Sequence, residues 1–121
     1  MNNFVKLYMD TLYDLADLEA LAMGDNDFMK ELLAANVESI EAGIEAIAKS
    51  YTEGDLDTMG KEAHKIKPLL AMLKADKLHK PIVDIELYSR KEYSPEQVQR
   101  AYAEFEPLAP VLLQQLKELI A

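Results

Sequence analysis

The sequence predicts an all-α fold, namely an antiparallel up-down-up-down four-helix bundle with a short additional helix near the N-terminus. Apolar residues make up 50% of the 121 residues and recur every three or four positions, the period of an amphipathic helix. Glycine occurs only four times and Asn-Gly is missing, which disfavours β-hairpins. The long amphipathic segments are joined by short connections, so residues 1–121 are predicted to form one domain.

The first predicted helix is short and follows an N-terminal stretch without a clear pattern. Its apolar residues are Leu15, Leu18, Leu21 and Ala22. Gly24 is suited to the left-handed backbone conformation that ends many helices, so the helix is expected to stop there.

The second predicted helix follows Asp25, whose side chain can cap its N-terminus, and continues to about Tyr51. Asp27 is favourable in the first turn because the helix dipole is positive at that end. The stripe expected to face the core consists of Phe28, Leu32, Leu33, Asn36, Ile40, Ile44 and Ile47.

The third predicted helix begins after Gly54, with Asp55 as its N-terminal cap. Its apolar stripe is spaced by three or four throughout, which places these side chains on one face. The stripe consists of Leu56, Met59, Ala63, Ile66, Leu70 and Leu73.

Two further helices complete the bundle. The fourth lies within residues 76–88 and is expected to bury Leu78, Ile82 and Ile85. The fifth opens with residues 94–97, Ser-Pro-Glu-Gln, which have the arrangement of a capping box with proline at the first helical position. Its stripe consists of Val98, Tyr102, Phe105, Ala109, Leu112, Leu116 and Leu119. Pro107 and Pro110 lie inside this segment, so the helix must kink or divide there.

Composition excludes several classes of function. The 13 Lys and Arg residues against 22 Asp and Glu residues give a net charge of −9, which disfavours nucleic acid and anionic membranes as partners. Cysteine is absent, so disulfides and thiolate chemistry are excluded. No apolar run approaches the roughly 20 residues that span a bilayer, and no phosphate-binding Gly-rich loop occurs. We therefore expect a cytoplasmic protein without autonomous kinase activity.

The charges are unevenly distributed along the chain. Residues 10–57 hold 13 acidic residues and two lysines, whereas residues 61–80 hold six lysines and two acidic residues. A basic segment in an acidic protein is a candidate docking surface for an acidic partner. An ordinary solvated helix face explains the same distribution.

His64 occupies a definite place on the third predicted helix. Because the apolar stripe is buried, the imidazole points outward, with Gly60, Lys61, Lys67 and Pro68 three and four positions away. Two of these neighbours are compact and two are cationic. A neutral imidazole is a good nucleophile and ammonium groups pair with phosphate oxygens, so the site can accept a phosphoryl group. A surface histidine without function satisfies the same spacing.

Residues 63–67, Ala-His-Lys-Ile-Lys, followed by a compact residue, resemble the Ala-His-x-Leu-Lys-Gly motif of histidine-containing phosphotransfer (HPt) domains. The likeness continues through residues 18–33, where that family enters its first long helix, and through residues 54–56, the turn before its histidine helix. Residues 73–86 follow the spacing of the same family. In all, the resemblance spans residues 15–86 and is weaker in the last helix.

The resemblance implies a role for two residues and a class of partner. His64 is expected to be the phosphoacceptor, and Lys67, one turn later, to support the phosphoryl group. The partners implied are response-regulator receiver domains with an acidic phosphoaspartate pocket, and a hybrid sensor kinase is a further candidate. The chain itself is expected to need no cofactor and to hold no metal, because the divalent metal of the reaction is expected in the partner receiver domain.

The predicted partner-binding surface surrounds the histidine, with compact residues at its centre and lysines on its rim. It comprises Gly60, Lys61, Lys65, Pro68 and Ala71. The rim lysines could equally be solvated without contributing to binding.

Four positions depart from the pattern of the HPt family. Pro68 replaces a glycine, residues 69–70 (Leu-Leu) replace a small polar pair, and Lys74 replaces a second glycine. Proline cannot donate a backbone hydrogen bond to the His64 carbonyl, so a bend in the helix is expected there. These departures leave open an alternative function, an HPt-like binding module that docks on a kinase or receiver without being phosphorylated. A purely structural bundle is a third reading.

The remaining candidate residues favour structural roles. His79 lacks the compact neighbours of His64 and is expected to be a surface or half-buried residue. Glu62 is two positions from His64 and on another face, so a di-iron site is disfavoured. The methionines at or beside core positions are expected to fill the core; these are Met23, Met29, Met59 and Met72.

Overall fold

The computed structural model describes residues 10–121, and all regular secondary structure in this range is helical. The all-α class predicted from the sequence is therefore confirmed. The elements are α2 (Ala16–Ala22), α3 (Asn26–Glu53), α4 (Leu56–Met72), α5 (Asp76–Glu86), the π-helical turn η1 (Leu87–Lys91), α6 (Pro95–Phe105) and α7 (Ala109–Ile120).

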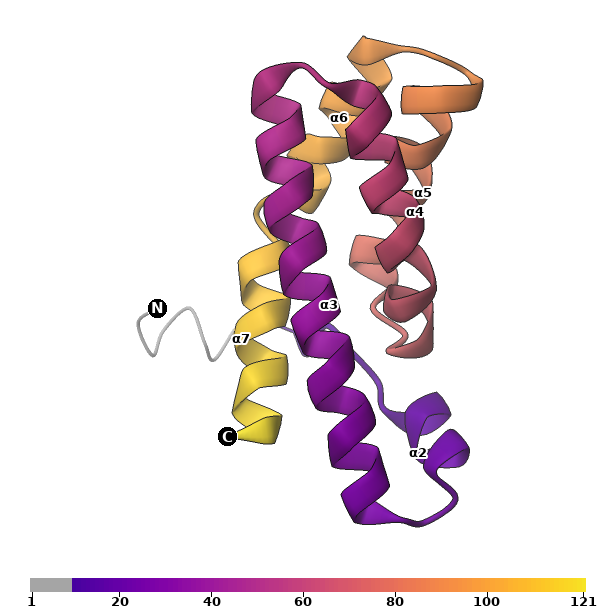
Figure 1. Cartoon of the computed structure of the whole chain (residues 1–121), viewed down its shortest axis with the longest axis vertical. Coiled ribbons are helices and arrows are strands. Elements are labelled where there is room, and N and C mark those ends of the chain that lie inside the picture. The colour runs from indigo at the N-terminus through magenta and orange to yellow at the C-terminus, as the bar shows by residue number, and fades with distance from the viewer. Residues whose placement is uncertain (1–9) are drawn as a thin grey trace.

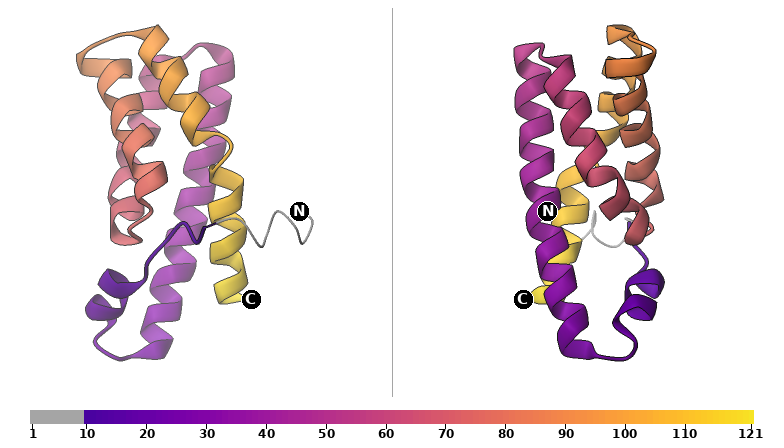
Figure 2. Two further views of the ribbon diagram at one scale, coloured as in Figure 1. Left: turned by 180° about the vertical axis from the view of Figure 1, so that it is seen from behind. Right: turned by 45° about the vertical axis from the view of Figure 1, so that its right-hand side comes forward.

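The long helix α3 organises the molecule (Figure 1). Its 28 residues correspond to a length of about 42 Å. α4 lies beside its C-terminal half and α5 lies on the far side of α4, while α2 and α7 lie beside the N-terminal half of α3, as two further views show (Figure 2). α4 packs against both α3 and α5, α6 packs against α5, and α7 packs against α3. No helix within residues 10–121 is both long and apolar enough to cross a bilayer.

The predicted helix N-termini are confirmed. The side chain of Asp25 accepts a hydrogen bond from the backbone N–H of Phe28 at 3.0 Å, and that of Asp55 accepts one from Thr58 at 3.1 Å. The Ser94 hydroxyl accepts one in the same way at the start of α6. Each bond satisfies an amide that has no partner within its helix, so these caps fix where the long helices begin.

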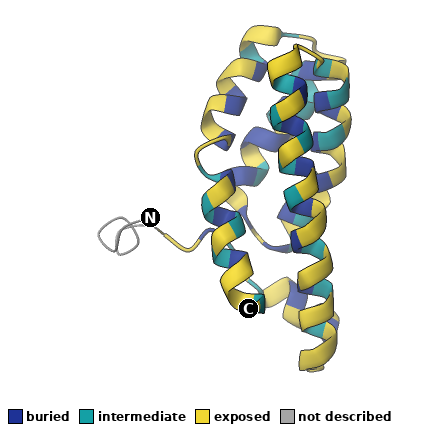
Figure 3. Ribbon diagram, turned by 60° about the vertical axis from the view of Figure 1, so that its left-hand side comes forward, coloured by how far each residue is buried: buried dark blue, intermediate teal, exposed yellow. Residues whose placement is uncertain are grey.

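Most residues of the predicted stripes form one continuous core, which lines the inward faces of the helices in Figure 3. In α4 the stripe from Met59 to Leu70 is buried, as predicted. Phe28 and Leu21 are corrections, because their side chains are 43% and 51% exposed. Both lie next to the turn between α2 and α3, where no third helix covers them. Met23, in that turn, is exposed as well and does not fill the core.

Proline divides the last predicted helix. α6 ends at Phe105, a turn holds Pro107, and α7 begins at Ala109 with Pro110 in its first turn. Proline is tolerated there because a backbone N–H in the first turn has no hydrogen-bond partner within the helix. The rings of Tyr51, near the C-terminal end of α3, and Tyr102, in the last turn of α6, are stacked with their centroids 4.2 Å apart. This stack adds an aromatic contact between α3 and α6.

The turn between α4 and α5 is tight. Lys74 has a φ of +48°, the left-handed conformation that glycine adopts more readily. Its ammonium lies 3.6 Å from the carboxylate of Asp17 in α2. The backbone N–H of Asp14 donates to the Leu73 carbonyl at 2.8 Å, so the segment before α2 is also fixed to this turn.

Candidate functional site

His64 lies in the middle of α4 on its outward face. Its side chain is 64% exposed, while Ala63 and Ile66 beside it are buried. The orientation predicted from the helical spacing is therefore confirmed. An imidazole in this position is open to a second molecule without any movement of the core.

Glu86, at the C-terminal end of α5, contacts two of the predicted site residues. One carboxylate oxygen, Oε2, is hydrogen-bonded to Nδ1 of His64, and the other, Oε1, accepts a hydrogen bond from the Lys67 ammonium at 2.5 Å. The Glu86 side chain is 19% exposed and that of Lys67 is 33% exposed. The structure thus brings His64 and Lys67 together through a carboxylate from a different helix.

The ionisation of Glu86 fixes the form of the imidazole. Burial raises the pKa of this carboxyl, but the hydrogen bonds and charges of Lys67 and His64 outweigh it, so the pKa of Glu86 lies below its ordinary value of 4.5. At neutral pH the carboxylate can only accept hydrogen bonds. The Nδ1 atom of His64 must therefore carry a proton, which leaves the lone pair of the neutral ring on Nε2.

Sequence reasoning did not identify Glu86 as a site residue, although a signal was available. α4 and α5 form a hairpin around the turn at Lys74, and residues equally distant from such a turn lie at the same height. His64 precedes Lys74 by ten positions and Glu86 follows it by twelve, so the two residues lie at nearly the same distance from the turn along the hairpin. An acidic residue on α5 at that height is the one able to reach the histidine.

Gly60 is a correction to the predicted partner-binding surface. It is buried, because α4 approaches η1 closely at this position. A Cβ placed on Gly60 would lie 2.2 Å from Oγ of Ser89 and 2.8 Å from Cγ of Arg90. Gly60 therefore serves to seat η1 against α4 one turn before His64, and it is not available to a partner.

The predicted rim lysines are exposed but pair within their own helix. The Lys61 ammonium lies 2.9 Å from Asp57 and the Lys65 ammonium lies 3.1 Å from Glu62. Exposed pairs of this kind contribute little to stability, yet they neutralise part of the positive charge predicted for α4. Pro68 and Ala71 are exposed on α4, as the predicted surface requires.

A hollow of about 930 Å³ lies beside His64, where α4 faces the end of α5 and η1. His64, Lys67 and Glu86 line it together with residues from η1 and beyond. η1 contributes two cations, Arg90 and Lys91, besides Leu87 and Ser89, and Tyr93 adds an exposed aromatic ring. The His64 side chain therefore lines a concave surface rather than an isolated helix face.

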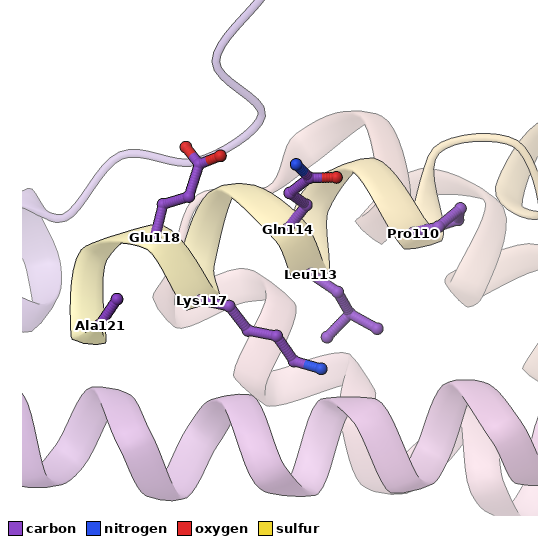
Figure 4. Close-up of a pocket in the computed structure, with 6 residues that line it drawn as sticks. All are labelled: Pro110, Leu113, Gln114, Lys117, Glu118 and Ala121. Carbon is purple, nitrogen blue, oxygen red and sulfur yellow. The ribbon is translucent and has the colours of Figure 1, made fainter. Parts of the chain in front are cut away.

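A second hollow, of about 490 Å³, runs along α7 (Figure 4). Its lining includes Pro110, Leu113 and Lys117, and it contains no histidine. Lys117 extends toward α3, where its ammonium pairs with Glu41. This hollow lacks the combination of histidine, lysine and glutamate that lines the hollow beside α4, so the hollow beside His64 is the better candidate site.

The other sequence candidates do not form a site. His79 is half-buried on α5, in agreement with the prediction of a surface or half-buried residue. Over residues 10–121, no group of three or more histidine, aspartate or glutamate side chains is placed to hold a metal ion. Comparison of the chain with known protein families, with curated proteins and with solved structures finds no match.

Proposed function

We propose that this protein is a histidine phosphotransfer protein of a two-component phosphorelay. His64 accepts a phosphoryl group from the aspartate of one receiver domain and passes it to the aspartate of another. The observation that carries the proposal is the exposed imidazole whose Nδ1 is held by Glu86 beside the Lys67 ammonium. The resemblance of residues 63–67 to the HPt motif supports the same assignment.

Each transfer step follows from the protonation of the ring. Nε2 of His64 attacks the phosphorus of the phosphoaspartate, and the N–P bond forms as the P–O bond to the aspartate breaks. The electron pair of that bond leaves with the aspartate carboxylate. The ring keeps its Nδ1 proton and becomes positively charged, a charge that the adjacent Glu86 carboxylate stabilises. In the second transfer, a partner aspartate attacks the phosphorus and Nε2 leaves with its lone pair restored.

Lys67 provides positive charge for the phosphoryl oxygens. Its ammonium has three donors, so it can bind a phosphoryl oxygen while one donor remains on Glu86. Positioning and neutralisation of charge account for most catalysis of phosphoryl transfer. The proposed protein is thus a carrier that needs no cofactor of its own, and the divalent metal belongs to the receiver domain.

The proposal extends to the arrangement of the helices and to the place of action. α3, α4, α5 and the divided pair α6 and α7 would form the up-down-up-down bundle of an HPt domain, with α2 as the short additional helix. The packing of α4 on α3 and α5, and of α6 on α5, supports this arrangement. A phosphorelay carrier of this kind acts in the cytoplasm, where receiver domains are accessible.

Phosphoryl transfer from a purified receiver domain tests the proposal. The receiver is phosphorylated with radiolabelled acetyl phosphate, freed of excess donor and mixed with the protein. The label should move to the protein, survive alkali and be released by acid, as a phosphohistidine requires. His64→Gln should abolish labelling and the matched variant His79→Gln should retain it. Acid-stable label, or label that depends on His79, would contradict the assignment.

The binding module without phosphorylation is the second candidate function. Two observations favour it: Pro68 lies within α4 one turn after His64, and Lys67 is already bound to Glu86. This candidate predicts that receivers or kinases bind the protein without transferring the label. It also predicts equal binding by the parent protein and His64→Gln.

A further inference from the structure

The positive charge that remains without an internal partner near His64 comes from η1. Lys61 and Lys65 pair with acidic side chains of α4, and Lys67 pairs with Glu86. Among the ion pairs of residues 10–121, none involves Arg90 or Lys91, and both are exposed. The sequence predicts the basic segment at residues 61–80, whereas the unpaired cations that line the hollow beside His64 are Arg90 and Lys91 of η1.

These two cations line the same hollow as the nucleophile. The acidic residues of that lining are Asp57, which pairs with Lys61, and Glu86, which pairs with Lys67. Glu92, the next residue along the chain, does not line the hollow. The hollow therefore presents two available positive charges to a molecule that approaches His64.

Contacts with α4 and α5 hold η1 in place beside His64. A π-helical turn is rare and is found frequently at functional sites. Gly60 allows η1 to pack directly on α4, and the aliphatic part of Arg90 covers that glycine. Ser89, at the centre of η1, is buried and its hydroxyl donates to the Glu86 carbonyl at 3.2 Å. η1 is thus fixed to the helix that carries His64 and to the end of α5 that carries Glu86.

We infer that η1 is the docking element for an acidic protein surface that delivers a phosphoryl group to His64, with Arg90 and Lys91 as its contact charges and Tyr93 and Val83 as its apolar contacts. This inference rests on the proposed function. A phosphoryl group carries a charge of about −1.5 to −2 at pH 7, so a partner that presents one brings strong negative charge to the hollow. Exposed aromatic and apolar side chains beside unpaired cations are typical of protein contacts. The partner would therefore approach from the α5 and η1 side of His64.

The test compares variants that remove the same charge at different places. Arg90→Gln/Lys91→Gln keeps the aliphatic stem that covers Gly60 and removes two positive charges. Lys30→Ala/Lys49→Ala removes two exposed positive charges from α3 and serves as the control. The probe is a receiver domain loaded with acetyl phosphate, chosen as the fastest donor to the parent protein. The measured quantity is the second-order rate constant of transfer at low and at high salt.

The η1 variant should lower this rate constant about tenfold at low salt, and the difference should shrink at high salt, because steering by charge is screened. Arg90→Glu/Lys91→Glu should lower it further, and the α3 control should stay within about twofold of the parent. Chemical phosphorylation of His64 by phosphoramidate should proceed equally in all of these proteins. Circular dichroism should show the same helicity throughout.

Three results with the variants would overturn the inference. Equal rate constants for the η1 variant and the α3 control would remove η1 from the docking surface. A larger loss in Lys61→Ala/Lys65→Ala would place docking on α4 instead. An equal loss with phosphoramidate would mean that Arg90 and Lys91 bind the phosphoryl group itself as a small anion. If the parent protein accepts phosphoryl from no receiver but is labelled by phosphoramidate, the proposed function fails first and the inference falls with it.

Discussion

Glu86 and His64 are 22 positions apart and are joined across α4 and α5 by a hydrogen bond between Oε2 and Nδ1. This bond gives the exposed imidazole a defined tautomer before any partner arrives. In the proposed phosphoryl transfer, the carboxylate would also place a negative charge where the ring becomes positive. The same two atoms therefore link the packing of the hairpin to the reactivity of its histidine.

The variant Glu86→Gln tests the charge in this relationship. An amide can still hydrogen-bond to the imidazole but carries no charge, and charge-assisted hydrogen bonds are roughly twice as strong as neutral ones. Transfer from a phosphorylated receiver to His64 should slow by about five- to tenfold, which corresponds to about 1 kcal/mol in the barrier. Glu62→Gln, which alters a carboxylate on another face of α4, is the control. An unchanged rate in Glu86→Gln would mean that only the geometry of the bond matters.

The lowered pKa of Glu86 predicts a pH dependence of stability. Because the carboxyl titrates below its ordinary value of 4.5 in the folded protein, its ionised form is favoured by folding. This contribution is complete above pH 4.5 and is lost as the pH falls through the pKa of the folded state. The free energy of unfolding of the parent should therefore approach that of Glu86→Gln as the pH is lowered below 4.5. Urea unfolding at a series of pH values measures it, and a constant difference between the two proteins would contradict the prediction.

Lys67→Ala should separate function from folding. The lysine is partly exposed, and its ion pair with Glu86 is expected to contribute no more than about 1 kcal/mol to stability. Phosphoryl transfer should slow by about tenfold or more, since a charge at the phosphoryl oxygens is lost. Lys49→Ala, an exposed lysine on α3, provides the comparison. A large drop in melting temperature with little change in transfer would make Lys67 a structural residue.

Pro68→Ala should raise stability and reduce transfer. Proline within a helix is about 3 kcal/mol worse than alanine, and here it leaves the His64 carbonyl without its helical donor. If this local strain helps to present His64, its removal stabilises the fold at a cost to function. Denaturant unfolding and transfer rates are measured on the same samples. A variant that is more stable and transfers at least as fast as the parent would show that the proline is only tolerated.

Gly60→Ala should destabilise the protein, even though alanine is the better helix former by about 1 kcal/mol. The new methyl group would meet Oγ of Ser89 and the stem of Arg90 at distances shorter than atoms allow, and overpacking of this kind costs about 1–3 kcal/mol. Adding Ser89→Ala removes the nearest atom and should restore part of the loss. Urea unfolding of the single and double variants measures this coupling. Additive effects would mean that α4 and η1 do not touch at this point.

Features that depend on neighbouring residues in the chain were predictable. The caps at Asp25, Asp55 and Ser94 each involve a side chain and an amide three positions later, so the local sequence determines them. The buried stripe of α4 and the exposure of His64 follow from the helical period in the same way. The division of the last helix follows from the missing N–H groups of Pro107 and Pro110.

Features that depend on how two elements meet were not predicted. The contact of Gly60 with Ser89 requires the exact separation of α4 and η1, which helical spacing does not contain. The contact of Glu86 with His64 depends on how α4 and α5 are aligned along their axes. The π-helical turn continues α5 without a break in the apolar pattern, so the pattern gives no sign of it. Phe28 carries the right spacing to be buried but has no neighbour to cover it.

The Tyr51–Tyr102 stack gives the protein an optical reporter. The sequence has six tyrosines and no tryptophan, so near-ultraviolet signals come mainly from phenol rings. Burial, together with the charge of Glu106 and the neighbouring Tyr51, raises the pKa of Tyr102 above the ordinary 10.0. In an alkaline absorbance titration, Tyr102 should therefore ionise late, and a shift of that step toward lower pH would register separation of α3 from α6. Unlabelled protein thus suffices to follow whether events at His64 change the contact between α3 and α6.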